Sequence, residues 1–214
     1  MLHKYLEIAS TPAVKNARQH YGSAGQYARI DGTLDPGAAP RNHLLGPDEE
    51  AFIARRGEFY LASVSETGWP YVQFRGGPIG FLKVLGSKTL GFADYRGNRQ
   101  YITTGNVAGN DRVSLFLMDY AQQRRLKIFG HMHVVDVTLD TALAARLAVP
   151  GYDARVERAV TITIEAFDWN CPQHITPRFS EAELAEWLEP VKARLAFLED
   201  ENRRLKNRLE QGAA

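Results

Sequence analysis

Cysteine is nearly absent from this chain: Cys171 is the only one among 214 residues. A framework of intramolecular disulfides is therefore excluded, and we expect a reducing compartment. No apolar run approaches the roughly 18 residues that a membrane-spanning helix needs. The first residues also lack the apolar stretch of a signal peptide. These absences predict a cytoplasmic globular protein with no membrane partner.

An excess of charge of either sign is missing as well. The chain has 26 lysines and arginines against 25 aspartates and glutamates, which leaves a net charge of +1. Such a balance provides no electrostatic field for a nucleic acid, so we expect no nucleic-acid partner. The length is enough for one domain with appendages and for a sizeable hydrophobic core.

The first 46 residues predict a short helix followed by an arm. Thr11 can cap a helix over residues 12–20, with Pro12 at its first position. From residue 22 to residue 46 the composition is that of a loop, including Asp35-Pro36-Gly37. We expect this arm to lie over the core or over a partner subunit. A second helix is predicted over residues 47–56, because Pro47 and three acidic residues begin it.

A long run of strand-like segments follows. Alternating and β-branched residues separated by turn signals predict strands over residues 59–64, 69–75, 81–85, 89–94, 112–118, 124–137 and 155–167. A bulge in the last of them would let Val156, Val160, Ile162 and Ile164 share one face. A short helix is expected over residues 140–147. Six or seven closely spaced strands with few helices favour a mainly β, closed antiparallel barrel.

The stretch from Thr89 to Tyr101 is the first candidate binding site. A strand ends in a turn at Arg96-Gly97, and a helix is predicted to begin with Asn98 as its N-cap and to run to about residue 107. Arg99 and Gln100 would then lie in the first turn, where free amides and a guanidinium favour a phosphate. The alternative is an ordinary capped helix with a solvated arginine.

The strand over residues 124–137 is the second candidate. Its apolar face carries Leu126, Ile128, Met132 and Val134, while its polar face carries Arg125, Lys127, His131 and His133 with Phe129 among them. Arg125 and Lys127 would face an anionic ligand, or this face is simply solvated. The two histidines have no acidic or cysteine partner at ligand spacing, so no metal site is predicted.

The segment from Asp168 to Phe179 is rich in functional groups between two prolines, which is common in functional loops and also in surface connectors. No general base accompanies Cys171 in the sequence, so a catalytic thiol is not expected. His174 is the best candidate for an acid or base, and the catalytic residues stay unassigned.

The C-terminal tail carries a heptad pattern. Apolar residues alternate at spacings of four and three over nearly four repeats, and Asn202 occupies an a position: Leu184, Leu188, Val191, Leu195, Leu198, Asn202, Leu205 and Leu209. Ser180 and Glu183 can form a capping box at the start. Pro190 should kink or restart the helix. A lone Asn at an a position favours a parallel two-stranded coiled coil, and the alternative is a helix packed on its own barrel.

Residues 59–135 resemble the pyridoxamine 5′-phosphate oxidase-like family, the FMN-binding split barrels. The likeness lies in Phe81-Leu82-Lys83, in the strand through Phe92, in Asn98-Arg99-Gln100 and in the two strands from Arg112 and Arg124. The segment over residues 68–78 and the loop Asn170-Cys171-Pro172-Gln173-His174 are similar to an uncharacterised bacterial branch of that family. The family usually has Ser-Arg-Lys where this chain has Asn-Arg-Gln.

The resemblance implies a homodimer with an FMN site at the subunit interface. Lys83 and Arg99 would hold the phosphate with Asn98 and Gln100 assisting, and the backbone at Ala93 and Asp94 would pass beside the flavin. Arg125 stands where the family often has a glutamine that faces the flavin. Trp169 would approach the flavin ring from its own or from the other subunit.

The resemblance also implies a division of the chain and a function. Residues 1–46 would be a helix and arm, residues 47–179 an FMN-binding split barrel, and residues 180–214 a coiled-coil-like helix. The expected function is that of an FMN-dependent oxidoreductase with a small-molecule substrate or electron donor. The family's late Arg-Leu-His substrate motif is missing, so the substrate is expected to differ from pyridoxamine phosphate. The alternative is a flavin- or haem-binding carrier or sensor without turnover.

Overall fold

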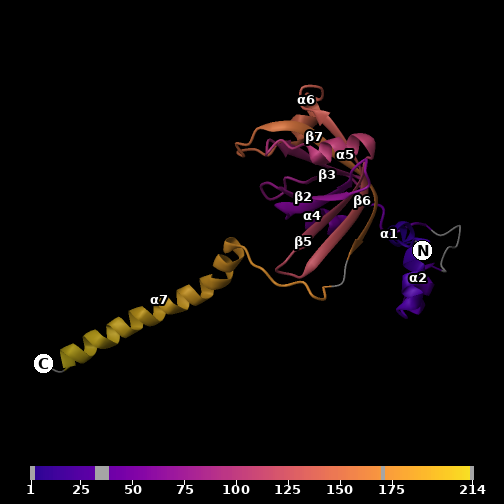
Figure 1. The fold of residues 1–214 in the computed structure, drawn as a ribbon. Helices are drawn as coiled ribbons and strands as arrows, with labels where there is room; N and C mark the ends of the chain where they lie inside the picture. Colours follow the sequence, from indigo (N-terminus) through magenta and orange to yellow (C-terminus); the bar gives the residue numbers. More distant parts are fainter. Residues whose placement is uncertain (1–2, 32–38, 170–171, 213–214) are drawn as a thin grey trace. The chain divides into compact units, whose positions relative to one another are not determined.

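The computed structural model describes residues 3–31, 39–169 and 172–212 of the chain (Figure 1). Seven strands form one sheet in the order β2-β1-β5-β6-β7-β4-β3, and every neighbouring pair is antiparallel. The strands are β1 (Glu58–Val64), β2 (Pro70–Gly76), β3 (Lys83–Gly86), β4 (Thr89–Tyr95), β5 (Arg112–Asp119), β6 (Arg124–Asp136) and β7 (Val156–Trp169).

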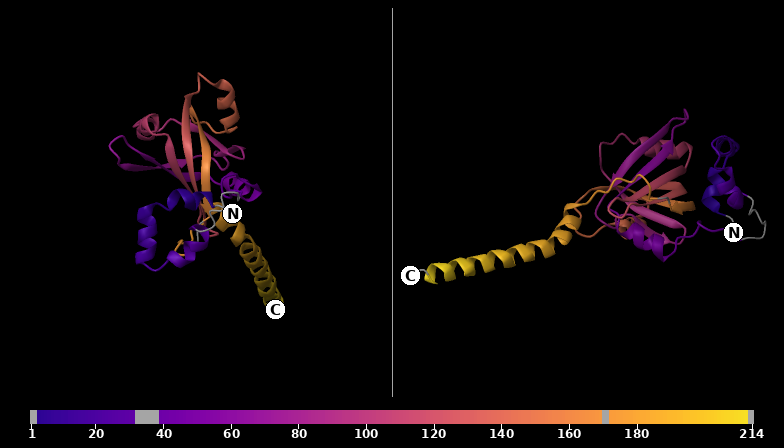
Figure 2. Two further views of the ribbon diagram at one scale, coloured as in Figure 1. Left: turned by 90° about the vertical axis from the view of Figure 1, so that its right-hand side faces the viewer. Right: turned by 90° about the horizontal axis from the view of Figure 1, so that it is seen from below.

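The sheet is curled, but its hydrogen-bonded order ends at β2 on one side and at β3 on the other (Figure 2). A closed barrel would need these two strands to pair, and no such pair joins them among the described residues. The prediction of a closed barrel is therefore corrected to an open, curled antiparallel sheet. The seven strands themselves are confirmed, each with ends that lie within a few residues of those predicted.

The bulge predicted in β7 is confirmed. The register between β4 and β7 shifts between Asp94 and Tyr95, which pair with Arg158 and Val156. Beyond the shift, Val160, Ile162 and Ile164 are all buried in the core. Val156 packs instead against a smaller cluster around Ala159 and Leu147. The prediction that it shares a face with Val160, Ile162 and Ile164 is therefore wrong, because the bulge moves Val156 to the opposite face of the strand.

A second register shift lies between β6 and β7, at Phe129 and Gly130. A Cβ atom added to Gly130 would lie 2.7 Å from the carbonyl oxygen of Thr163 and 2.8 Å from Ile162 Cγ2. Both neighbours belong to β7, which the ladder holds in place. Glycine is therefore what allows the backbones of the two longest strands to approach each other here.

Aromatic side chains fill the centre of the core. Phe59 lies 5.4 Å from Phe92 and 5.6 Å from Phe81, measured between ring centroids. Helix α4 (Pro47–Ala54) adds Phe52 and Ile53, which are also fully buried. The helix begins at Pro47 after Gly46, whose amide donates to the Glu49 side chain (2.9 Å), and carries three acidic residues in its first turn, as predicted.

The other helices of the sheet unit are short: α1 (Lys4–Ala9), α2 (Pro12–His20), α3 (Ala24–Asp31), α5 (Ile102–Gly109) and α6 (Thr141–Leu147). The predicted helix over residues 12–20 is confirmed, and the Thr11 side chain caps it by accepting from the Val14 amide. The predicted arm is helical over α3, and the segment Asp35-Pro36-Gly37 lies outside the described residues.

Helix α1 packs on the sheet through a charged and aromatic cluster. The Tyr5 ring stacks on Phe129 at 4.4 Å, and Lys127 Nζ lies 4.7 Å from the centre of the same Tyr5 ring. Lys127 also pairs with Asp168 (2.9 Å), which His3 Nε2 approaches at 3.3 Å. Lys127 therefore faces α1 and Asp168, and the prediction that it faces an anionic ligand is corrected.

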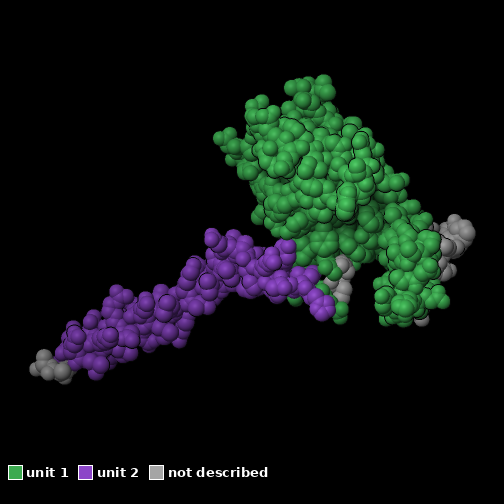
Figure 3. Space-filling view, viewed as in Figure 1, with its two compact units in different colours: residues 1–119, 123–173 green, residues 120–122, 174–214 purple. Residues whose placement is uncertain are grey.

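Helix α7 (Glu181–Gly212) belongs to a separate compact unit, formed by residues 120–122 and 174–214, while residues 1–119 and 123–173 form the other (Figure 3). Ser180 and Glu183 form the predicted capping box. The helix continues through Pro190 without a restart, and its axis bends in the first turns (Figure 1). Proline removes one backbone hydrogen bond and its ring crowds the carbonyl oxygen four residues earlier, so a long helix can continue past it with a bend.

None of the described helices combines the length and apolar character that a passage through a lipid bilayer demands.

Candidate functional site

The loop between β4 and α5 has an unusual backbone. Arg99 and Tyr101 both adopt left-handed conformations, with φ of 61° and 54°. The side chain of Asn98 accepts a hydrogen bond from the Gln100 amide (3.2 Å) and so closes a local turn. Helix α5 begins at Ile102 with Tyr101 as its N-cap. The predicted helix start at Asn98 is therefore wrong, because the Asn98 side chain stabilises a turn that competes with helix formation.

Two hydrogen bonds hold α5 against the sheet beside this loop. Thr103 Oγ1 donates to Gln73 on β2 (2.8 Å), and Asn106 Nδ2 donates to Ser63 on β1 (3.0 Å) in a buried position. The side chain of Tyr101 does not cap the first turn. The N-terminal amides of α5 thus lie beside the loop without a side-chain acceptor from the N-cap, which is the arrangement that favours an anion.

A cavity of about 240 Å³ lies between this loop, the start of α5 and strands β2, β4 and β7. Its lining is mostly polar and includes three arginines and two carboxylates: Tyr71, Gln73, Arg75, Asp94, Tyr95, Gly97, Asn98, Arg99, Gln100, Tyr101, Ile102, Thr103, Thr104, Glu157 and Arg158. Tyr71, Gln73 and Arg75 alternate along β2 and therefore share one face of that strand. We call this space the arginine cavity.

Asp94 organises the floor of the arginine cavity. Its side chain is only 3% exposed and accepts hydrogen bonds from Arg75 and from Arg158, the latter through Nε (2.8 Å) and Nη2 (2.7 Å). Burial lowers the pKa of Arg158, but the hydrogen bond and charge of Asp94 raise that pKa further, so the net shift is upward. A carboxylate held by two guanidinium groups fixes both arginines in orientation.

Arg99 is the solvent-facing cation of the cavity. Its Nε donates to the Tyr101 hydroxyl (3.1 Å), and that hydroxyl donates to Glu157 (3.4 Å). The hydrogen bond to Tyr101 raises the pKa of Arg99, so this guanidinium stays charged at any physiological pH. Since Glu157 is also bonded to Arg158 (3.1 Å), the chain from Arg99 to Asp94 is continuous.

Arg75 lines the arginine cavity, and its Nε is buried with no hydrogen-bond partner among the described residues. The Tyr95 hydroxyl is also buried without such a partner, but the Tyr95 ring packs against Tyr152 and the cluster of Ala93, on the face of β4 opposite to Asp94. Burial raises the pKa of Tyr95, and the nearby Tyr152 adds to the rise, so the hydroxyl keeps its proton. Buried donors without acceptors are costly unless a ligand or water accepts from them. The donor set therefore fits a group with several acceptor oxygens, such as a phosphate.

The structure brings four of the eight predicted binding residues together around this cavity. Asp94 lies at its floor, and Asn98, Arg99 and Gln100 form the adjoining loop. Ala93 is next to Asp94, but its side chain is buried in the cluster of Leu147 and Ala159.

The other three predicted residues make contacts elsewhere in the chain. Lys83 donates to the carbonyl oxygens of Arg146 (2.9 Å) and Ala148 (2.7 Å), and so satisfies the C-terminal end of α6. Trp169 Nε1 donates to Glu49 (2.6 Å) on α4. Arg125 lies over the Phe116 ring at 5.7 Å, and its Nε is buried without a partner among the described residues. Their roles toward a flavin stay predictions.

Arg75 and Arg158 were missed by sequence reasoning. The period-two alternation of β2 could have shown that Arg75 shares a face with Tyr71 and Gln73. No local pattern reveals Arg158, because its partner Asp94 lies 64 residues away in sequence.

The described residues that line the arginine cavity include no histidine. His131 pairs with Asp111 (3.0 Å) outside the cavity. In the described ranges, no group of three or more His, Cys, Asp or Glu side chains is arranged to hold a metal ion. Asn170 and Cys171 lie outside the described residues, and His174 has a left-handed backbone with φ of 62°.

The curled antiparallel sheet carries a basic, polar cavity beside a helix N-terminus, an arrangement that favours an anionic small molecule. The sequence model described as "Pyridoxamine 5'-phosphate oxidase" matches residues 45–166, which is more than half of the chain. The chain therefore belongs to the pyridoxamine 5′-phosphate oxidase-like family of FMN-binding split barrels. No curated protein matches it.

Solved structures of similar fold include a protein related to general stress protein 26 from Clostridium acetobutylicum. It is 16% identical, covers 64% of this chain and 94% of its own, and has a TM-score of 0.46. An FMN-binding protein from Syntrophomonas wolfei is 8% identical, with coverage of 74% and 97% and a TM-score of 0.43. HupZ from Group A Streptococcus is 12% identical, with coverage of 63% and 100% and a TM-score of 0.44. With scores this low, the family assignment rests on the sequence match.

Proposed function

We propose that this protein is an FMN-binding oxidoreductase whose arginine cavity holds the phosphate of the flavin. The observation that carries the proposal is the donor set of the cavity: three guanidinium groups, a helix N-terminus, and the buried Arg75 Nε without an acceptor. Family membership supplies the identity of the cofactor. When bound, FMN would supply the redox chemistry, and the chain supplies position and electrostatics.

The residues of the cavity would have different roles in binding the phosphate. Arg99 is exposed and uses only its Nε on Tyr101, so its terminal nitrogens can reach a phosphate oxygen, and Arg75 Nε can donate from the floor. Asp94 and Glu157 hold the guanidinium groups in place rather than contact the anion. A cavity of about 240 Å³ suits a phosphate and its near atoms. The flavin ring would extend beyond it.

A second copy of the chain is proposed to complete the site. Val72 and Phe74 alternate with the cavity-facing residues of β2 and are exposed on the opposite face of the sheet. Tyr60 on β1 lies 5.8 Å from Phe74, and Phe116 on β5 contacts Arg125. This aromatic surface spans neighbouring strands and is of the kind that homodimers bury. Arg125 and Trp169 would then reach a flavin only across the dimer.

The alternative is a flavin- or haem-binding carrier or sensor without turnover. A haem is held by an axial ligand, most often His, Cys or Met. The described lining of the arginine cavity has none of these, so the cavity favours a flavin phosphate over a haem. The substrate is proposed to differ from pyridoxamine phosphate, because a heptad helix stands where the family has its late substrate motif.

The test is the affinity for FMN, measured by quenching of flavin fluorescence. Arg99→Ala should weaken binding, and Arg99→Lys should weaken it less, because the charge remains while the planar donor fork is lost. Arg112→Ala is the matched control, since Arg112 is an exposed arginine of the same unit and lies outside the cavity lining. Equal affinity of the wild type and Arg99→Ala would contradict the proposal.

Two further measurements separate the remaining possibilities. Lys83→Ala tests the residue that the family resemblance assigns to the phosphate but whose Nζ binds carbonyl groups of α6. Unchanged FMN affinity would confine the phosphate site to the arginine cavity. Oxidation of NADPH by the FMN-loaded wild type would support an enzyme, whereas FMN binding without turnover of any reductant would favour the carrier.

A further inference from the structure

Helix α7 has an apolar stripe that remains open to solvent over its whole length. Its members lie at spacings of four and three and are each 41–74% exposed: Leu184, Leu188, Val191, Leu195, Leu198, Leu205 and Leu209. A helix of 32 residues gains most of its stability by burying such a stripe. This stripe therefore requires a partner surface.

The spacing assigns heptad positions along the helix. Leu188, Leu195, Asn202 and Leu209 take the a positions, and Leu184, Val191, Leu198 and Leu205 take the d positions. A regular alternation of apolar a and d positions packs against another helix that has the same alternation. A flat sheet or an irregular groove would not require it.

The charged residues at the e and g positions beside the stripe indicate that the second helix is another copy of α7. In a parallel dimer, the g residue of one helix meets the e residue five positions later in the other helix. Arg194 would then meet Glu199 of the second copy, and Glu201 would meet Lys206 of the second copy. Two-fold symmetry repeats both contacts, so the same sequence supplies complementary charges to itself.

An antiparallel pair centred on the same stripe places Leu184 beside Leu209. Residues at g then meet g and residues at e meet e, so Arg194 would meet Glu201 and Lys192 would meet Glu199. These charges are also complementary, so the flanking charges do not decide the orientation. Asn202 decides it, because the antiparallel pair would pack its amide against Val191, whereas the parallel pair places the two copies of Asn202 together.

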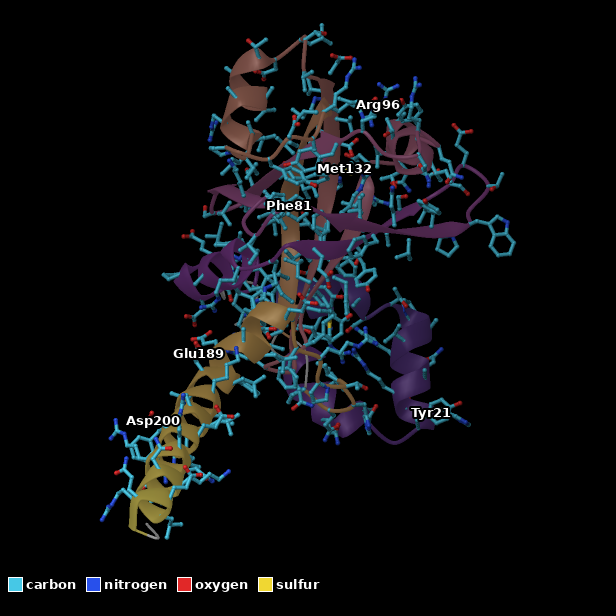
Figure 4. All side chains as sticks on the ribbon, turned by 90° about the vertical axis from the view of Figure 1, so that its left-hand side faces the viewer. Tyr21, Phe81, Arg96, Met132, Glu189 and Asp200 are labelled. Carbon is cyan, nitrogen blue, oxygen red and sulfur yellow. The ribbon has the colours of Figure 1, made fainter. Side chains whose placement is uncertain are left out.

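The ion pairs within the helix leave these charges available. Lys192 pairs with Glu189 (3.9 Å), and Asp200 pairs with Arg203 (3.9 Å) and Arg204 (2.9 Å). In the described part of α7, none of these bonds uses Glu199, Glu201 or Lys206. Figure 4 shows Glu189 and Asp200 standing out from the helix, where they stabilise it locally.

We propose that α7 forms a parallel, in-register, two-stranded coiled coil with α7 of a second copy of this chain. Asn202 faces its mate at an a position and fixes the register. The inference uses only residues of α7 and does not depend on FMN binding.

Disulfide cross-linking in the full chain tests the orientation, with Cys171→Ser as the background. A parallel in-register pair brings the two copies of an a position within the roughly 4.4–6.8 Å between Cα atoms that a disulfide spans. Leu188→Cys and, separately, Leu209→Cys should therefore form disulfide-linked dimers on oxidation. Ala193→Cys, at an f position on the opposite face, is the matched control and should give several-fold less.

Charge variants on the Leu188→Cys background test the partner. Glu199→Lys with Glu201→Lys makes the e and g positions uniformly basic and should abolish cross-linking. Arg194→Glu with Lys206→Glu makes the central e and g positions acidic, and co-expression of the two variants should restore cross-linking between them. The proposal is overturned if Leu188→Cys links no better than Ala193→Cys, or if the basic variant links as well as its parent.

Discussion

Leucine side chains have opposite environments in the sheet unit and in helix α7. Leu115, Leu117 and Leu126 are 0% exposed in the sheet, whereas Leu195 is 56% exposed and Leu209 is 74% exposed on the helix. The sheet buries its apolar residues against its own strands and α4. The helix displays an equally regular apolar pattern with nothing of its own unit over it. A periodic pattern therefore predicts an apolar face, but it does not tell which surface covers that face.

A matched pair of leucine substitutions tests most directly whether the apolar residues of the two units differ in this way. Leu115→Ala should lower the free energy of unfolding of the sheet by about 2–5 kcal/mol, because it leaves a cavity in a packed core. Leu195→Ala removes the same atoms from an exposed position and should leave the sheet within about 0.5 kcal/mol of the wild type. Urea denaturation followed by the fluorescence of Trp169, after replacement of Trp69 and Trp187, would measure both. Equal losses would mean that the two units unfold together.

Loss of the buried carboxylate should have the next largest effect. Asp94→Ala leaves Arg75 and Arg158 without their common partner, which should cost about 3 kcal/mol, since both arginines are still partly reached by water. Thermal unfolding would show a lowered Tm. Arg99→Ala, at the exposed end of the same chain of bonds, should leave Tm unchanged, so a similar drop in both variants would contradict the division between floor and rim.

The packing of α1 should depend on pH, since burial lowers the pKa of His3 below its ordinary value of 6.5. Asp168 raises this pKa and Arg41 lowers it, but burial is the largest influence. The unfolded chain therefore binds a proton first, and stability falls as the pH drops below 6.5 toward the folded pKa. His3→Gln should reduce this fall.

Urea midpoints measured at several pH values between 7 and 5 would detect the difference between wild type and His3→Gln. Lys127 and Tyr5 also face the cluster, and burial raises the pKa of Tyr5 to about 12, so Tyr5 keeps its proton in this range. Identical pH profiles would show that His3 does not titrate at this contact.

The smallest expected change concerns the helix alone. Asn202→Leu should raise the melting temperature of α7 and loosen the choice of oligomer, because an Asn at an a position specifies register at some cost in stability. Circular dichroism at 222 nm and light scattering would follow both effects. The unfolding transition of the sheet should not move. A shift of that transition would contradict the separation of the two units.

The strands could be predicted from the sequence because alternation and turn residues are local signals. A bulge in β7 was also predicted, but its effect on Val156 was not, because only the register shift shows that Val156 lies on the face opposite to Val160 and Ile162. The start of α5 was not, because Asn98 is equally suited to cap a helix and to close a turn with Gln100. The choice depended on how Thr103 and Asn106 bond to β1 and β2.

Only part of the candidate site could be predicted from the sequence. Asp94 and Arg99 lie in one short segment whose residue types already indicated an anion. Arg158 comes from β7, which pairs with β4 across a long separation in sequence. Lys83 was assigned by resemblance alone, and its contacts with the end of α6 depend on a helix more than 60 residues further on. Long-range pairing is what residue patterns could not supply.

Gly130 has a consequence for how this sequence can vary. Any larger residue there would press its Cβ against the Thr163 carbonyl oxygen, within a ladder whose two backbones have no room to separate. Gly97, by contrast, has no heavy atom within 4 Å of an added Cβ. In a library that randomises both codons and selects for soluble protein, survivors should retain glycine at 130 and accept many residues at 97. The contact between β6 and β7 therefore excludes substitutions at residue 130 during neutral evolution. The rim of the arginine cavity at residue 97 tolerates them and can change under selection.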